Sequence, residues 1–133
     1  MNINHNVILQ EFGDIIGLTL SFDKNGRCPL LVDGQILISI AIRGEYWQFH
    51  SLLMEDKQYN NSDLFTFCLQ LNIALAEDNA GALAYDPVSK YLIYISSQSE
   101  PATGGELLEI VRSIISHREL ILIKLKDFNQ HII

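Results

Sequence analysis

Residues 30–42, LLVDGQILISIAI, hold the feature that most constrains the fold: two apolar runs separated by an Asp-Gly pair. This pair predicts a β-hairpin, because Asp and Gly tolerate the positive φ angles of a tight antiparallel turn. In the second run every even-numbered position from 36 to 42 is isoleucine, but the other face also carries Leu37 and Ala41. A strand with one face in water should alternate apolar and polar residues, so we expect something other than water to cover part of its outer face.

The rest of the chain predicts one α+β domain that spans residues 1–133. Period-two patterns joined by turn residues predict a meander of four strands and then a hairpin of two, at 18–22, 27–32, 35–43, 46–54, 81–86 and 90–96. Near-helical apolar repeats predict helices at 3–16, 63–77 and 106–126, the last one beginning only after the Gly104-Gly105 linker. The expected order is α-β-β-β-β-α-β-β-α, with three helices and an antiparallel, strongly twisted sheet of five or six strands.

The expected helix over 63–77 is apolar almost all the way round. A helix that lies on one sheet needs only an apolar stripe, whereas a helix that is apolar on every side must be buried on both sides. A chain of 133 residues has too few other elements to cover both sides. We therefore expect a homodimer, in which a second subunit covers the free side.

Composition excludes several kinds of partner and site. The formal net charge is -7 over 133 residues, which makes nucleic acid and anionic membranes poor partners. We expect a cytoplasmic protein, since no run is long enough for a membrane-spanning helix and the first residues do not read as a signal peptide. The two cysteines have no CxxC spacing and the histidines no metal-ligand spacing, and no nucleophile or phosphate-loop motif occurs. We therefore expect no metal, no cofactor and no catalytic residues.

Two longer strings resemble the small acidic chaperones of bacterial type III secretion, the class I group that includes the chaperone of the translocated intimin receptor. The first is LQEFGDIIGLTLSFDKNGRCPLLVDGQILISI, at residues 9–40. The second is LQLNIALAEDNAGALAYDPVSKYLIYIS, at residues 69–96, in which Asn72 precedes GALAYDP. The resemblance covers residues 9–125. The aliphatic string ELILIKL departs from the family, whose members often carry an aromatic residue late in the third helix.

The resemblance implies a homodimer that binds the N-terminal region of a secreted effector, keeps that region extended and promotes its export without ATP. It also raises the secretion ATPase as a candidate partner. The outer apolar positions are then candidate effector contacts: Pro29, Leu31, Leu37, Ala41, Tyr46 and Leu52. The helix over 63–77 supplies the candidate dimer contacts: Leu64, Phe65, Cys68, Leu71, Asn72 and Leu75.

Other interpretations are open at this point. The outer apolar residues could pack beneath the first or third helix, because a sheet covered on both faces is apolar on both. The helix over 63–77 could likewise be buried wholly within its own chain. A homodimeric scaffold or regulator of the same fold that binds a folded partner is the alternative function, and a small enzyme with a pocket at the dimer seam is a third.

Overall fold

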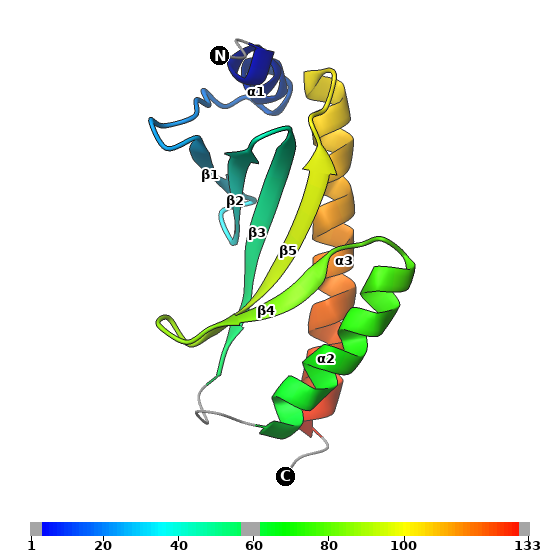
Figure 1. Cartoon of the computed structure of the whole chain (residues 1–133). Helices are drawn as coiled ribbons and strands as arrows, with labels where there is room; N and C mark the ends of the chain where they lie inside the picture. The colour runs from blue at the N-terminus through cyan, green and yellow to red at the C-terminus, as the bar shows by residue number, and fades with distance from the viewer. Residues whose placement is uncertain (1–3, 57–61, 131–133) are drawn as a thin grey trace.

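The computed structural model describes residues 4–56 and 62–130. In chain order the elements are α1 (Asn4–Ile16), β1 (Arg27–Val32), β2 (Ile36–Arg43), β3 (Tyr46–Glu55), α2 (Ser62–Glu77), β4 (Ala82–Asp86), β5 (Tyr91–Ser99) and α3 (Gly104–Gln130) (Figure 1). Three helices and a five-stranded antiparallel sheet confirm the expected α+β fold class. The Asp-Gly turn is also confirmed, since Asp33 and Gly34 both have positive φ angles.

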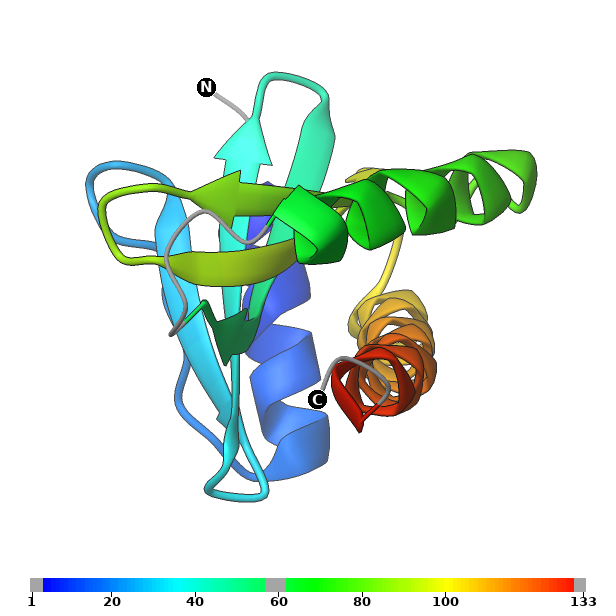
Figure 2. The same cartoon turned by 90° about the horizontal axis from the view of Figure 1, so that it is seen from below.

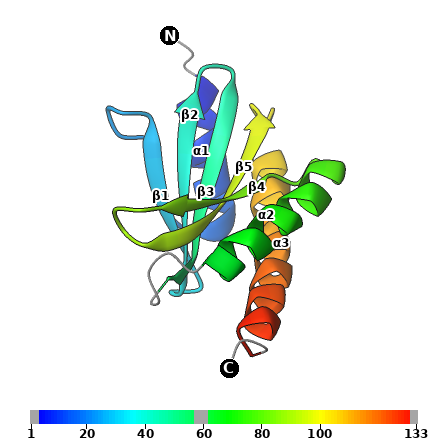
Figure 3. The same cartoon turned by 60° about the horizontal axis from the view of Figure 1, so that its bottom comes forward.

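The strand order in the sheet is β1-β2-β3-β5-β4, so β1 and β4 are its two edges. Figure 2 shows α1 and α3 on the same side of the sheet, while α2 lies beside β4 and extends away from the strands. Figure 3 shows the same separation, with α1 behind β1–β3 and α2 next to β4 and α3. One face of the sheet is thus covered by α1 and α3, and we call the opposite face of β1–β3 the outer face.

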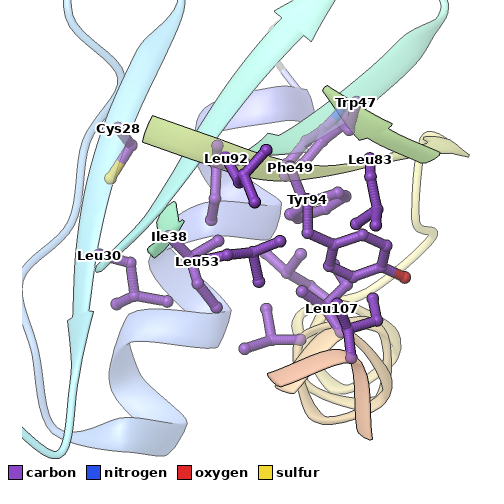
Figure 4. Close-up of a cluster of buried hydrophobic side chains, with 14 of the residues drawn as sticks. Cys28, Leu30, Ile38, Trp47, Phe49, Leu53, Leu83, Leu92, Tyr94 and Leu107 are labelled. Atoms are coloured by element: carbon purple, nitrogen blue, oxygen red, sulfur yellow. The ribbon is translucent and has the colours of Figure 1, made fainter. Parts of the chain in front are cut away.

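The core lies between the inner face of the sheet and the two helices α1 and α3. In β2, Ile38 and Ile40 are fully buried, in agreement with the isoleucine face in the sequence. Figure 4 shows side chains from the strands converging toward Leu107 of α3. Trp47 is fully buried as well, and its ring meets Phe22 edge-on at a centroid distance of 5.2 Å. Burial of such aromatic rings is a major source of stability in a domain of this size.

Residues 18–22 do not form the strand that their alternation predicts, so the described part of the chain before α2 has one strand fewer than expected. Leu20 and Phe22 still pack against the core, whereas Leu18 is exposed. The alternation therefore reflects the packing of Leu20 and Phe22 in a segment that pairs with no strand of the described sheet. The loop then turns onto β1, where Asp23 exchanges hydrogen bonds with Arg27.

The third helix begins at Gly104 and not after the glycine pair, which corrects the expected start. A Cβ atom at Gly104 would lie 2.5 Å from the Glu11 Cβ and 2.5 Å from the Phe12 nitrogen, so only glycine fits against α1. The Gly104 N–H donates to Glu11 Oε2 over 3.0 Å. The glycine is thus the point where α3 docks on α1, and the carboxylate satisfies one free amide of the helix N-terminus.

Candidate binding surfaces

A groove of about 280 Å³ lies beside β1, between the end of α1 and the middle of α3. Its lining is mostly apolar: Phe12, Ile16, Leu18, Leu30, Leu31, Val32, Leu108, Val111 and Ile115. Asp33 and Arg112 also line it, and Arg112 forms an exposed ion pair with Glu109 at 3.5 Å. Because most of the lining is apolar, the groove suits an apolar side chain from another molecule better than a polar one.

The edge of β1 next to this groove is open at Leu31. The backbone N–H of Arg27 is bonded to Asp23 Oδ1 and its carbonyl accepts from the Asp23 N–H, so the backbone groups of Arg27 point away from β2. Because this direction repeats every second residue, the carbonyl of Pro29 and both backbone groups of Leu31 point outward too. Pro29 suits such an edge, since it has no N–H to leave unpaired. Within the described residues, no strand pairs with this edge.

An apolar row crosses the outer face of the sheet. Leu31 of β1 lies opposite Leu37 of β2, Leu52 of β3 lies opposite Ile93 of β5, and Ile93 lies opposite Ala84 of β4. The β1–β2 part and the β3–β5–β4 part of this row adjoin. Ile38 of β2 pairs with Ser51 of β3, so the next residues along the two antiparallel strands, Leu37 and Leu52, lie side by side. We call Leu31, Leu37, Leu52, Ile93 and Ala84 the outer stripe. Leu31 is 54% exposed and Leu37 is 43% exposed, so this part of the stripe is not covered by α1 or α3.

The other expected effector contacts fall elsewhere. Pro29 is exposed beside the stripe, opposite Ser39. Tyr46 is exposed at the far end of the sheet, opposite Arg43 and Ser99.

Ala41 is only 1% exposed, which corrects the expectation that it offers an outer surface. Its cross-strand partners are Arg27 and Gln48, whose long side chains are large enough to cover one methyl group.

Arg118 of α3 braces the strand that carries Leu52. The Arg118 Nε donates to Ser51 Oγ over 2.9 Å, and its guanidinium also donates to the Leu52 carbonyl over 3.1 Å. The pairing of β3 with β5 shifts register between Leu52 and Met54, so these bonds hold the strand at its irregular point. Burial lowers the pKa of Arg118 from its ordinary value.

The expected dimer contacts on α2 mostly pack within their own chain. Leu64 and Cys68 are buried, and Phe65, Leu71 and Leu75 lie against the core. Burial raises the pKa of the Cys68 thiol to about 11. The exposed large apolar residues of α2 are Leu69 at 66% and Ile73 at 64%, one turn apart on the opposite side.

Asn72 contacts β4 rather than facing away from the chain. Its side-chain Nδ2 donates to the Leu83 carbonyl over 3.2 Å, and its Oδ1 accepts from the Leu83 N–H over 2.6 Å. The amide thereby supplies the two hydrogen bonds that a neighbouring strand would make with Leu83 at the free edge of β4. Unlike β1, this edge of the sheet is closed in its middle.

The charge on the outer face differs in sign from that of the whole chain. His50 lies opposite Ser39, and its side chain is 3.1 Å from Gln48 Oε1. Partial burial lowers the pKa of His50 from 6.5, and the positive charges of Arg27 and Arg43 lower it further. Both arginines therefore act on the middle of this face, although the chain carries a formal charge of -7.

Sequence reasoning missed the groove and the free side of α2. The groove is built from three segments that are far apart in sequence, so no local pattern marks it. One available signal is the apolar pair Ile16 and Leu18 on either side of Gly17, where a solvated helix end would be polar. On α2, apolar residues on all sides conceal which side is free.

Comparisons with solved structures find chains of similar fold. A chain in a structure of the ExsC-ExsE complex is 18% identical, with a TM-score of 0.81 over 94% of this chain and 97% of that chain. The HopA1-SchA chaperone-effector complex gives 16% identity and a TM-score of 0.69 over 90% and 95%. The Yersinia pestis type III secretion chaperone SycH, in complex with a YscM2 fragment, gives 14% identity and a TM-score of 0.63 over 87% and 98%.

These structural likenesses concern the fold, whereas the family is shown by the sequence. No helix within the described ranges is long and apolar enough to cross a membrane. A sequence model of the Tir chaperone protein (CesT) family matches residues 7–120. The chain therefore belongs to the Tir chaperone protein family.

Proposed function

We propose that this chain is a bacterial, cytoplasmic type III secretion chaperone. It binds an extended segment from the N-terminal region of one or more effector proteins, keeps that segment soluble and promotes its export without ATP. Membership of the Tir chaperone family supports this function, and the similar chains come from complexes described as those of a chaperone with its effector or of a type III secretion chaperone. The proposal includes no catalytic residue and no cofactor.

The open edge of β1 carries the proposal, because apolar surface lies on both sides of it. A segment that pairs with the backbone of Leu31 becomes a sixth strand of the sheet, and its side chains then alternate between the two faces. One set enters the groove between α1 and α3, and the other set lies against Leu31 at the end of the outer stripe, with Leu37 on the next strand. Leu31 belongs to both surfaces. An extended client is the form of chain that can use the backbone edge and both surfaces at once.

We also propose that the chaperone is a homodimer through α2. Leu69 and Ile73 form an exposed apolar patch, and two copies of one patch can meet around a two-fold axis. The residues that we first expected at this interface support it from beneath: Leu64 and Cys68 fix the inner side of α2, and Asn72 ties the helix to β4.

The test is co-expression with candidate secreted proteins, followed by limited proteolysis of the complex. We expect a protected client segment of several tens of residues that stays extended. Leu31→Asp and Leu37→Asp should each abolish the complex while the chaperone remains folded, since both side chains are exposed, Leu31 by 54% and Leu37 by 43%. Val88→Asp is the matched control, because Val88 is 90% exposed in the β4–β5 turn, away from the edge of β1.

Three results would contradict the proposal in different ways. A compact, folded protected client would favour the scaffold function. A client complex that survives Leu31→Asp and Leu37→Asp unchanged would place the binding surface elsewhere. Loss of folding in these variants, measured by circular dichroism, would make the two leucines part of the core.

A further inference from the structure

The outer face carries two arginines at the end away from the exposed leucines. Arg27 lies opposite Ala41, and Arg43 follows Ala41 by two residues on the same strand and face. Residues in these diagonal positions on neighbouring strands are about 7 Å apart, so the two guanidinium groups can act on one site. Together with Leu31 and Leu37 they give the face an apolar end and a positive end.

Neither arginine forms an ion pair within the described residues. Two carboxylates are close in sequence: Asp23 precedes β1, and Glu45 lies in the β2–β3 turn. Asp23 Oδ1 accepts hydrogen bonds from the backbone N–H groups of Asn25 and Arg27, so this oxygen is engaged in its own turn and not with a guanidinium group. Arg43 contacts the carbonyl of Ile42, its own neighbour.

The pKa of His50 supports a positive electrostatic potential on this part of the outer face. His50 lies on this face in β3, between β2 and β5; burial lowers its pKa, and the charges of Arg27 and Arg43 lower it further. In a chain with a formal net charge of -7, such a patch is a local reversal of sign.

We propose that the outer face selects client segments in which an apolar residue is separated by a short interval from an aspartate or glutamate that faces Arg27 and Arg43. The inference rests on the proposed function, since it names the chemistry of the client at that same surface. The apolar residue lies against Leu31 and Leu37, and the carboxylate lies at the positive end. The partner is thus an acidic, amphipathic peptide segment.

The strand geometry sets the interval. Leu31 and Arg27 are four residues apart on β1, and Leu37 and Arg43 are six residues apart on β2. An extended client advances by about the same 3.3 Å per residue, so its apolar and acidic residues should be about four to six positions apart. The turn before β1 occupies the edge at Arg27, so the client leaves the edge there and its carboxylate reaches the arginines from over the outer face.

A random-peptide library displayed on phage tests this inference without a known client. Selections are run on the immobilised wild type, on Arg27→Gln/Arg43→Gln, and on Lys124→Gln/Lys126→Gln, which removes the same charge from exposed positions on α3. We expect the wild type and the lysine control to enrich peptides with Asp or Glu about four to six positions from an apolar residue. The arginine double variant should lose that acidic preference and keep the apolar one. One labelled peptide should bind this variant about fivefold more weakly by fluorescence anisotropy, and added salt should reduce this difference.

Each other result has a definite meaning. Apolar peptides without acidic enrichment, or the same enrichment on the arginine variant, would overturn the inference and leave the proposed function standing. Equal weakening in the lysine control would mean that overall charge, not this face, attracts the peptides. A wild-type protein that selects no peptide would contradict the proposed function itself. Circular dichroism melts establish that all variants are folded.

Discussion

The side-chain amide of Asn72 pairs with both backbone groups of Leu83, over 3.2 Å and 2.6 Å, and so completes the edge of β4 from a helix. Leu83 is 7% exposed, so water cannot readily replace a lost partner. We expect Asn72→Ala to lower the free energy of unfolding by about 1–3 kcal/mol, measured by urea denaturation. Asn72→Asp should also lose stability in neutral solution, because one carboxylate oxygen still accepts from the Leu83 N–H but the other then faces the Leu83 carbonyl oxygen without a proton to donate. An Asn72→Ala protein as stable as the wild type would mean that the amide contributes nothing to this edge.

Gly104 and Gly105 give a matched pair of substitutions at the start of α3. Gly104→Ala places a methyl group against Glu11 and Phe12 and should lower the free energy of unfolding by about 1–3 kcal/mol. Gly105→Ala meets only Thr103 Oγ1 at 3.7 Å, so it should leave stability unchanged or raise it by up to about 1 kcal/mol. Thermal and urea denaturation measure both. Equal effects would show that the contact between α1 and α3 does not depend on the missing side chain.

His50 should make stability depend on pH. Its pKa in the folded protein is lowered from 6.5 by burial and by Arg27 and Arg43, so the unfolded chain takes up a proton more readily. Stability is therefore present above the unfolded pKa and is lost as the pH falls through 6.5 toward the folded value. Between about pH 7.5 and about pH 5, the wild type should lose more stability than His50→Gln. By NMR titration, Arg27→Gln should raise the pKa of His50; an unchanged pKa would show that this charge does not reach the face.

The dimer interface can be tested on the exposed side of α2. Leu69→Asp and Ile73→Asp put a charge into the proposed apolar contact, so sedimentation equilibrium should find monomers where the wild type gives dimers. Circular dichroism should be unchanged, because both side chains are more than half exposed. Val88→Asp should remain dimeric. A monomeric wild type would contradict the dimer, and dimeric variants would place the interface on another surface.

Local patterns were sufficient for most of the fold. Turn residues with positive φ, such as Asp33 and Gly34, separate the period-two segments where the strands do end. The pattern was misleading at 18–22, because alternation records which side chains are buried and not whether the backbone has a partner. The glycine pair was misleading too: Gly104 lies inside α3 because the approach of another helix, α1, requires it there.

The candidate site was only partly predictable. Alternation found Leu31 and Leu37 on the outer face, where both are exposed. It failed for Ala41, because the cover of a small side chain depends on the size of its cross-strand neighbours. It could not find the groove, since contacts between helices decide where the end of α1 lies relative to α3.

The two edges of the sheet differ. At the β4 edge the backbone groups of Leu83 are hydrogen-bonded to Asn72, whereas at the β1 edge the backbone groups of Leu31 have no strand beside them among the described residues. A fibre that grows by adding strands to a sheet needs two open sheet edges on each molecule, because one edge pairs with the copy before it and the other with the copy after it. Among the residues that the structure describes, one such edge is open at its middle, at Leu31 of β1, while Leu83 of β4 is engaged. Two copies that pair through the β1 edge therefore form one continuous sheet that a third copy cannot extend, because the Leu83 position at each far edge is already engaged by Asn72.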